Sequence, residues 1–212
     1  MQLIDKYFTN ITSKQRDQFI EMRSLYEYWN NKINLISRKN IQNLYTQHIL
    51  HSLSIAKVIK FKEKTNILDV GTGGGFPGIP LAILFPKTKF QLLDSITKKI
   101  KVVDNIYRSL DLKNVRTINK RAENINMKYD FIIGRAVTSI ISFQQLTKDK
   151  INTNSFNNID NGIIYLTGGD LNNELRNIKH KKYNISDFFQ EEFFRTKKII
   201  YIKQSISSHR NK

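Results

Sequence analysis

The spacing of apolar residues changes near residue 60, which divides the chain into two parts. Before that point the apolar positions recur every three or four residues, the spacing of an amphipathic helix. One helix is predicted to begin after Thr12, which suits an N-cap, and a second is predicted through residues 41–59. The apolar face of the first helix consists of Phe19, Met22, Tyr26 and Trp29. Residues 1–60 are therefore predicted to form a helical extension.

From residue 65 onward, short apolar runs alternate with helical segments. Glycine or polar residues end the runs, as is typical of buried strands in a parallel sheet. The predicted strands are residues 66–70, 90–94, 115–118, 129–133, 163–166 and 199–202. Strands that alternate with helices form βαβ units. We therefore predict an α/β fold with a mostly parallel, twisted sheet and helices on both faces.

The length of the chain suits one domain with an appendage. Its 212 residues are 40% hydrophobic, which is enough for a real core and argues against disorder. We expect a single domain over residues 1–212, in which the extension (1–60) packs on the core (61–212). The asparagine-rich stretch 152–161 is predicted to be a surface loop.

The composition also restricts the compartment and the chemistry. The longest apolar run, residues 79–85, is too short to cross a bilayer, and the N-terminus lacks the basic start of a signal peptide. The chain contains no cysteine, which excludes disulfides, thiolate metal sites and a cysteine nucleophile. We therefore expect a cytoplasmic protein that makes no membrane contact.

The charge is strongly positive. The chain has 35 Lys and Arg against 18 Asp and Glu, a formal net charge of +17. Such a field attracts polyanions and favours a nucleic acid partner. The chain is also rich in Asn, Ile and Lys, so the positive charge could instead reflect a bias in amino-acid composition. The basic clusters 179–182 and 195–198 could hold phosphates or form a solvated surface.

A glycine-rich loop follows the first predicted strand of the core. Glycines let the chain turn tightly and let a ligand lie against bare backbone near a helix N-terminus. The pattern D-x-G-x-G-x-G is met at Asp69, Gly71, Gly73 and Gly75, and it resembles the first motif of S-adenosylmethionine methyltransferases. A dinucleotide fingerprint that starts at Gly71 fails at Phe76, and no Gly-Lys-Ser/Thr of a P-loop follows.

Asp94 ends the next predicted strand and completes a nucleoside site. A carboxylate at this position accepts hydrogen bonds from the two ribose hydroxyls. The alternative role is a cap on the following helix. Asp69 is expected to orient the loop from within its strand. The predicted cofactor is therefore S-adenosyl-L-methionine.

Several longer motifs identify a family. They are WNxxINLIS (29–37), HILxSL (48–53), ILDVGTG (67–73), GFPGIPLA (75–82), LLDSxxKK (92–99), RAE (121–123) and YDxxxxRAV (129–137). In these motifs, which cover most of residues 25–140, the chain resembles the 16S ribosomal RNA guanine-N7 methyltransferases (RsmG, also called glucose-inhibited division protein B). The resemblance implies a Rossmann-like methyltransferase fold and methylation of guanine N7 in 16S ribosomal RNA or a small-subunit precursor. We also expect a monomer.

The resemblance assigns cofactor contacts to Gly71, Phe76, Ala122, Glu123 and Arg135. Phe76 is expected to cover the adenine or the methionine arm, and Ala122 and Glu123 to meet the adenine amino group. Arg135 closes the fourth predicted strand, at the edge where α/β sheets bind ligands, and is the residue on which catalysis is expected to depend. The alternatives for Arg135 are a solvent-facing side chain or an ion pair with Glu123.

Three residues depart from the family pattern. His51 stands where the family has aspartate, Gly74 replaces a proline, and Thr167 stands where lysine is typical. The last change removes a cation from the edge where RNA is expected. After residue 140 the match is weak.

Residue types that the chain lacks restrict the possible methyl acceptors, independently of the family resemblance. Methylation at C5 of a pyrimidine needs a cysteine, and amine methylation typically uses an Asn/Asp-Pro-Pro-Tyr/Phe loop; the chain has neither. Guanine N7 carries a free lone pair, so its methylation needs positioning without a general base. The four histidines do not form a metal-site pattern, so no metal is expected. The alternatives are another RNA site, a small-molecule substrate, a non-catalytic binding protein and, more remotely, an NAD-dependent dehydrogenase.

Overall fold

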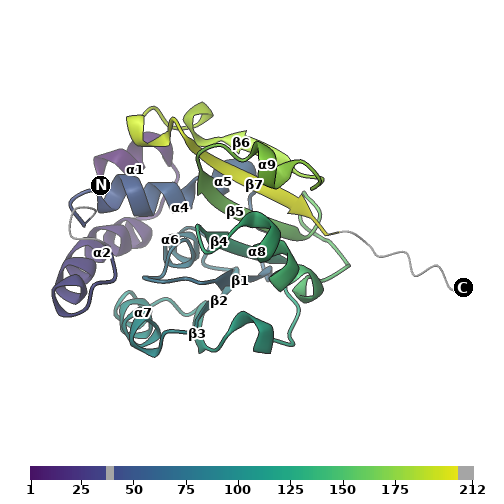
Figure 1. The fold of residues 1–212 in the computed structure, drawn as a ribbon. Helices are drawn as coiled ribbons and strands as arrows, with labels where there is room; N and C mark the ends of the chain where they lie inside the picture. Colours follow the sequence, from purple (N-terminus) through teal and green to yellow (C-terminus); the bar gives the residue numbers. More distant parts are fainter. Residues whose placement is uncertain (37–40, 205–212) are drawn as a thin grey trace, which may run out of the picture.

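The protein is built around one seven-stranded sheet (Figure 1). The computed structural model describes residues 1–36 and 41–204; Ser37, the end of the WNxxINLIS motif, lies outside them. The strands are β1 (Asn66–Val70), β2 (Lys89–Asp94), β3 (Val115–Asn119), β4 (Phe131–Arg135), β5 (Gly162–Gly168), β6 (Lys181–Asn184) and β7 (Lys197–Lys203). Their order is β3-β2-β1-β4-β5-β7-β6. The first five are parallel, and β7 runs antiparallel to both β5 and β6.

The six predicted strands are all present, with one shift and one addition. β4 begins two residues later than predicted, because Tyr129 makes an isolated bridge to Ile151. β6 was not predicted, because its sequence Lys-Lys-Tyr-Asn carries no apolar alternation. It forms at the sheet edge, where pairing with β7 is sufficient and charged side chains are tolerated.

The N-terminal extension begins with two α-helices, α1 (Gln2–Tyr7) and α2 (Ser13–Lys32). The predicted cap is present: the Thr12 hydroxyl accepts a hydrogen bond from the Gln15 amide, and the Gln15 side chain accepts one from the Thr12 amide. Of the predicted apolar face, Phe19, Met22 and Tyr26 are fully buried and Trp29 packs against them.

The second predicted helix is not a regular α-helix. It starts as a π-helix, η1 (Leu44–Leu50), and continues as two short pieces, α4 (His51–Leu53) and α5 (Ile55–Val58). Its apolar residues are buried as the spacing predicted, but the wider π-turn is invisible to that spacing. π-helical turns in proteins occur frequently at functional sites.

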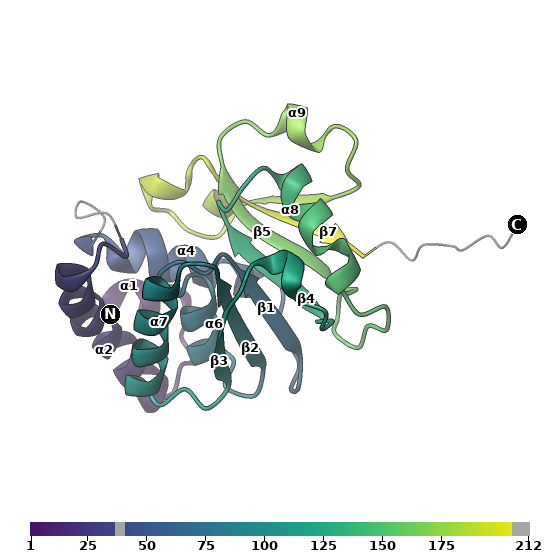
Figure 2. The ribbon, with the colours of Figure 1, turned by 60° about the horizontal axis from the view of Figure 1, so that its bottom comes forward.

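Helices cover both faces of the sheet (Figure 2). The extension lies on one face together with α6 (Gly78–Leu84) and α7 (Thr97–Ser109); α8 (Ile140–Thr147) and α9 (Asn172–Leu175) lie on the other. Because side chains alternate along a strand, Ile133 joins the core under the extension and Ile132 joins the core under α8. In the described residues no helix combines the length and apolar content that a membrane span needs.

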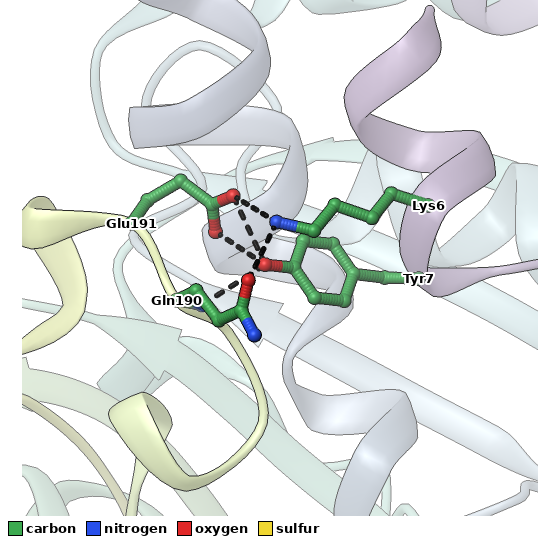
Figure 3. Close-up of polar contacts among 4 residues, drawn as sticks. All are labelled: Lys6, Tyr7, Gln190 and Glu191. Atoms are coloured by element: carbon green, nitrogen blue, oxygen red, sulfur yellow. Dashed lines mark hydrogen bonds and ion pairs between the residues drawn. The ribbon is translucent and has the colours of Figure 1, made fainter.

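The extension is also bonded to the segment that precedes β7 (Figure 3). The Tyr7 hydroxyl lies 3.0 Å from both carboxylate oxygens of Glu191 and accepts a hydrogen bond from the Gln190 amide at 2.9 Å. Lys6 adds an exposed ion pair with Glu191 at 3.5 Å, which contributes little to stability. The first helix is thereby fixed to the last part of the sheet.

Candidate functional site

The glycine loop connects β1 to α6 at the carboxyl edge of the sheet. Gly71, Gly73 and Gly75 have φ values of +68°, +58° and +92°, a region in which only glycine is free of strain. A Cβ at Gly71 would also lie 2.8 Å from the Val137 side chain, in the segment after β4. The D-x-G-x-G-x-G pattern therefore reflects both backbone conformation and close approach of a neighbouring segment.

Asp69 holds the two ends of this loop together. One of its carboxylate oxygens accepts hydrogen bonds from the Thr72 hydroxyl at 2.6 Å and the Gly78 amide at 2.9 Å. Burial raises the pKa of Asp69 to about 7, although these two hydrogen bonds and the charge of Arg135 lower it. Asp69 thus orients the loop from within β1, as the sequence predicted.

A cavity of about 680 Å³ opens beside the loop, a size typical of small-molecule sites. Six predicted cofactor residues line it: Gly71, Gly73, Asp94, Ala122, Glu123 and Arg135. The other lining residues were not predicted as cofactor contacts; they are Val70, Leu93, Ser95, Ile96, Lys99, Lys120, Arg121, Ala136, Val137, Thr138, Ser142 and Leu146. Residues from the ends of β1, β2, β3 and β4 thus meet at one edge, as expected of a parallel sheet.

Asp94 is held by hydrogen bonds from two backbone amides, and its binding of ribose stays a prediction. One carboxylate oxygen accepts a hydrogen bond from the Gly73 amide at 2.9 Å, and the other accepts one from the Ile96 amide at 2.9 Å. The second bond closes the turn before α7. Each carboxylate oxygen can accept a second hydrogen bond, so this arrangement leaves Asp94 able to bind ribose hydroxyls.

Gly75 and Phe76 are not among the residues that line the cavity. The Phe76 ring is 2% exposed and packs against Tyr26 and His48, with ring centroids 4.8 and 5.1 Å away. The Arg135 guanidinium lies 5.1 Å from the same centroid. The ring therefore contacts protein groups, and the prediction that it covers the cofactor gains no support from its position.

Arg135 lies between the cavity and the π-helix. Its guanidinium donates to the Gln47 carbonyl at 3.2 Å and lies 3.0 Å from Nδ1 of His48. Burial and the nearby Arg135 charge lower the pKa of His48 to about 3, so the imidazole is neutral and its Nδ1 accepts. Arg135 is half-buried, and within the described residues it forms no ion pair with Glu123. The side chain is therefore held by the π-helix, and the alternative of an ion pair with Glu123 is not met among the described residues.

The Arg135 guanidinium remains charged near neutral pH. Burial lowers its pKa to about 10, against the attraction of Asp69 and Tyr26, which raises it. Its hydrogen-bond partners are a carbonyl and a neutral imidazole, so they orient the cation without neutralising it. The site therefore presents, next to the cavity, a cation that forms no ion pair among the described residues.

Two tyrosines that were not predicted as site residues fix the backbone of the glycine loop and of the cavity wall after β4. The buried Tyr26 hydroxyl donates to the Gly74 carbonyl at 2.6 Å, which ties α2 to the glycine loop. The Tyr165 hydroxyl accepts hydrogen bonds from the amides of Val137 and Thr138 at 2.7 and 3.1 Å. Both tyrosines lie on apolar faces of their elements, so from sequence they are indistinguishable from core residues.

Two of the departures from the family pattern lie behind the site. His51 is buried against Phe193 and Phe194, and burial lowers its pKa well below the usual value. At Gly74 a Cβ would make only ordinary contacts, at 3.7 Å or more. Among the described residues, no three His, Asp or Glu side chains gather as a metal site would require.

Two solved methyltransferase structures share this fold. An S-adenosylmethionine-dependent methyltransferase from Aquifex aeolicus matches with a TM-score of 0.58 at 16% identity, over 80% of this chain and 100% of that chain. Precorrin-6y C5,15-methyltransferase from Geobacter metallireducens matches with a TM-score of 0.55 at 10% identity, over 82% and 92% of the two chains. At such identities the likeness shows the fold, which is the predicted Rossmann-like methyltransferase fold.

Sequence relatives are much closer and share one description. A ribosomal RNA small subunit methyltransferase G of Flavobacterium psychrophilum is 54% identical over 95% of this chain and 97% of that protein. The protein of the same description from Cytophaga hutchinsonii is 50% identical over 95% and 99%. The family model described as "rRNA small subunit methyltransferase G" matches residues 15–200. The chain belongs to the rRNA small subunit methyltransferase G family, as its motifs predicted.

Proposed function

We propose that the protein transfers a methyl group from S-adenosyl-L-methionine to N7 of a guanine in 16S ribosomal RNA. The family and its fold support the cofactor and the ribosomal RNA substrate. The net charge of +17 suits a polyanionic substrate. Ribosomal RNA as substrate also supports the expectation that the protein works in the cytoplasm.

The cavity fits the cofactor that the fold implies. Gly71 and Gly73 present bare backbone to the cavity, where a ligand can lie against it. Asp94 would accept the ribose hydroxyls, and Ala122 and Glu123 lie where the adenine would meet the end of β3. When bound, S-adenosylmethionine supplies an electrophilic methyl group on its sulfonium.

One observation favours N7 as the acceptor. The cavity wall formed by the end of β4 and by α8 consists of Arg135, Ala136, Val137, Thr138, Ser142 and Leu146. No carboxylate or imidazole is among these lining residues, so this wall offers no general base. Guanine N7 needs none, because its lone pair is already free in the plane of the ring. The absence of a base here disfavours acceptors that must lose a proton before they react.

Catalysis by this site would therefore depend on alignment. The wall after β4 is fixed by Tyr165, and Arg135 is fixed by Gln47 and His48. A charged guanidinium held in this way can donate hydrogen bonds to the base or to the cofactor while leaving N7 unoccupied. Correct orientation of two reactants alone accounts for much of the rate in such transfers.

Asp94→Ala is expected to weaken binding of S-adenosylhomocysteine by about 1.5–3 kcal/mol, the value of hydrogen bonds to a charged group. The variant loses the predicted ribose contact and also releases the Gly73 amide. Isothermal titration measures the loss, and NADH serves as the ligand that should not bind. Unchanged affinity would remove Asp94 from the cofactor site.

The function itself is tested in 16S ribosomal RNA from cells that lack the gene. Borohydride and aniline cleave RNA at 7-methylguanine, so cleavage should disappear in the deletion strain and return with the wild-type protein. A purely binding protein would bind S-adenosylhomocysteine without restoring cleavage. Methylation of another RNA site would appear as a modified nucleoside that is not 7-methylguanine. Failure of the wild-type protein to restore cleavage would refute the proposal.

A further inference from the structure

A second cavity, of about 230 Å³, lies on the α9 face of the sheet. Three separate segments supply its lining: α9, the start of β6 and the start of β7. The lining residues are Leu171, Asn172, Leu175, Arg176, His180, Lys182 and Lys198. Three permanent cations and a histidine thus line this cavity together with two buried leucines, Leu171 and Leu175.

The sheet register determines this convergence. Lys182 pairs with Ile200, and Lys198 pairs with Asn184, so the two lysines are diagonal neighbours on one face of β6 and β7. Ile200 belongs to the core under α8 and α9, which identifies that face. Lys181 is adjacent in sequence but pairs with Tyr201, which belongs to the opposite core. Adjacent lysines on β6 therefore serve different faces.

The same register also concerns position 167, where the family typically has lysine and this chain has threonine. Thr167 pairs with Lys198 across β5 and β7, so their side chains share a face. The edge of the sheet beyond β5 therefore carries a cation from β7. Lys198 is half-buried, and its amino group donates to the Gly169 carbonyl, which directs it to this edge.

The cations of this second cavity are not neutralised within the protein. Among the ion pairs of the described residues, none includes Arg176, Lys182 or Lys198. The acids of the same segment, Glu174 and Asp170, accept hydrogen bonds from the Ile140 and Asn172 amides and form no ion pair with these cations. The cavity is therefore a concave site with three cations that form no ion pair among the described residues, as suits an anion.

The second cavity lies close to the methyl-transfer site. In the register, Arg135 of β4 is opposite Leu166 of β5, which is opposite Ile199 of β7. Two strand spacings, about 10 Å, thus separate the end of β4 from the start of β7. α8 contributes Ser142 and Leu146 to the wall of the first cavity, and the second cavity is lined by Leu171 and Leu175 of the core cluster that α8 and α9 cover.

We propose that the second cavity binds a backbone phosphate of the RNA near the guanine that is methylated. The inference rests on the proposed function and adds to it where the RNA strand is anchored. Lysine and arginine side chains from different segments hold phosphate oxygens through charge-assisted hydrogen bonds. Such contacts fix the register of a strand without reading its sequence. The phosphate site would thereby position the base at the methyl donor.

The test compares the double variant Lys182→Gln/Lys198→Gln with the matched control Lys181→Gln. The substrate is unmodified 16S ribosomal RNA, naked and in small subunits from the deletion strain; whichever form the wild-type protein methylates is used. We expect the double variant to raise KM on the order of tenfold, as loss of charged hydrogen bonds does, with kcat changed little. The single variant Lys198→Arg keeps the charge, so its KM should stay close to the wild-type value.

Salt dependence provides a readout that a folding defect would not produce. Loss of the contact to this one phosphate should reduce the slope of log affinity against log salt by about 0.7, the contribution of each phosphate neutralised on a single strand. Affinity for S-adenosylhomocysteine should stay at the wild-type value. An unchanged slope, or a loss no larger than that of Lys181→Gln, would overturn the phosphate site. Failure of the wild-type protein to methylate either substrate would refute the proposed function instead.

Discussion

Replacing Arg135 with alanine is expected to slow methyl transfer on the order of 100-fold or more while the protein stays folded. The side chain is the one charged group at the end of β4 that both lines the cavity and is held rigidly from behind, by Gln47 and His48. Without it the base or the methyl donor loses a fixed partner, and a displacement of about 1 Å suffices for such a loss. The measurement is borohydride–aniline cleavage of 16S ribosomal RNA from cells that carry the variant.

Arg135→Lys separates geometry from charge. Little rescue is expected, because an ammonium group cannot donate to the Gln47 carbonyl and the His48 imidazole while still presenting a planar face to the Phe76 ring. Thermal unfolding checks that both variants fold. Full cleavage with Arg135→Ala would show that methyl transfer does not depend on this residue.

Gly71→Ala is expected to weaken cofactor binding by at least tenfold. The backbone at Gly71 has φ of +68°, and a Cβ there would lie 2.8 Å from Val137, another residue of the cavity wall. A strained backbone of this kind costs about 1–3 kcal/mol, and the loop or the segment after β4 must move to relieve the contact. Isothermal titration with S-adenosylhomocysteine measures the change.

Gly74→Ala is the matched control, in the same loop and with the same added methyl group. Gly74 is not among the glycines with positive φ, and its Cβ would make only contacts of 3.7 Å or more. Affinity for S-adenosylhomocysteine should therefore stay close to the wild-type value. Equal losses in the two variants would mean that the loop tolerates no methyl group anywhere, and that the clash with Val137 is not the cause.

Sequence periodicity predicted the elements in which buried apolar residues recur at a regular spacing. The core strands and α2 bury their apolar residues at the spacing that each element requires. The edge strand β6 and the π-helix η1 were missed for a common reason. β6 forms because β7 offers hydrogen bonds, and η1 differs from an α-helix in its turns and not in which residues are apolar. Strand pairing at a sheet edge and the number of residues per helical turn leave no periodic pattern of apolar residues in the sequence.

The chain by itself determined the glycine loop, the carboxylate at the end of β2 and the family, because these depend on residues that are close in sequence. Only the tertiary structure determined which groups hold the Arg135 side chain. Its partners Gln47 and His48 are more than 80 positions away, on a π-helix of the extension. It also decided that Lys198 faces the same side as Thr167 and Lys182. Contacts between distant segments follow from strand register and helix packing, which are set by the burial of the whole core and not by any local pattern.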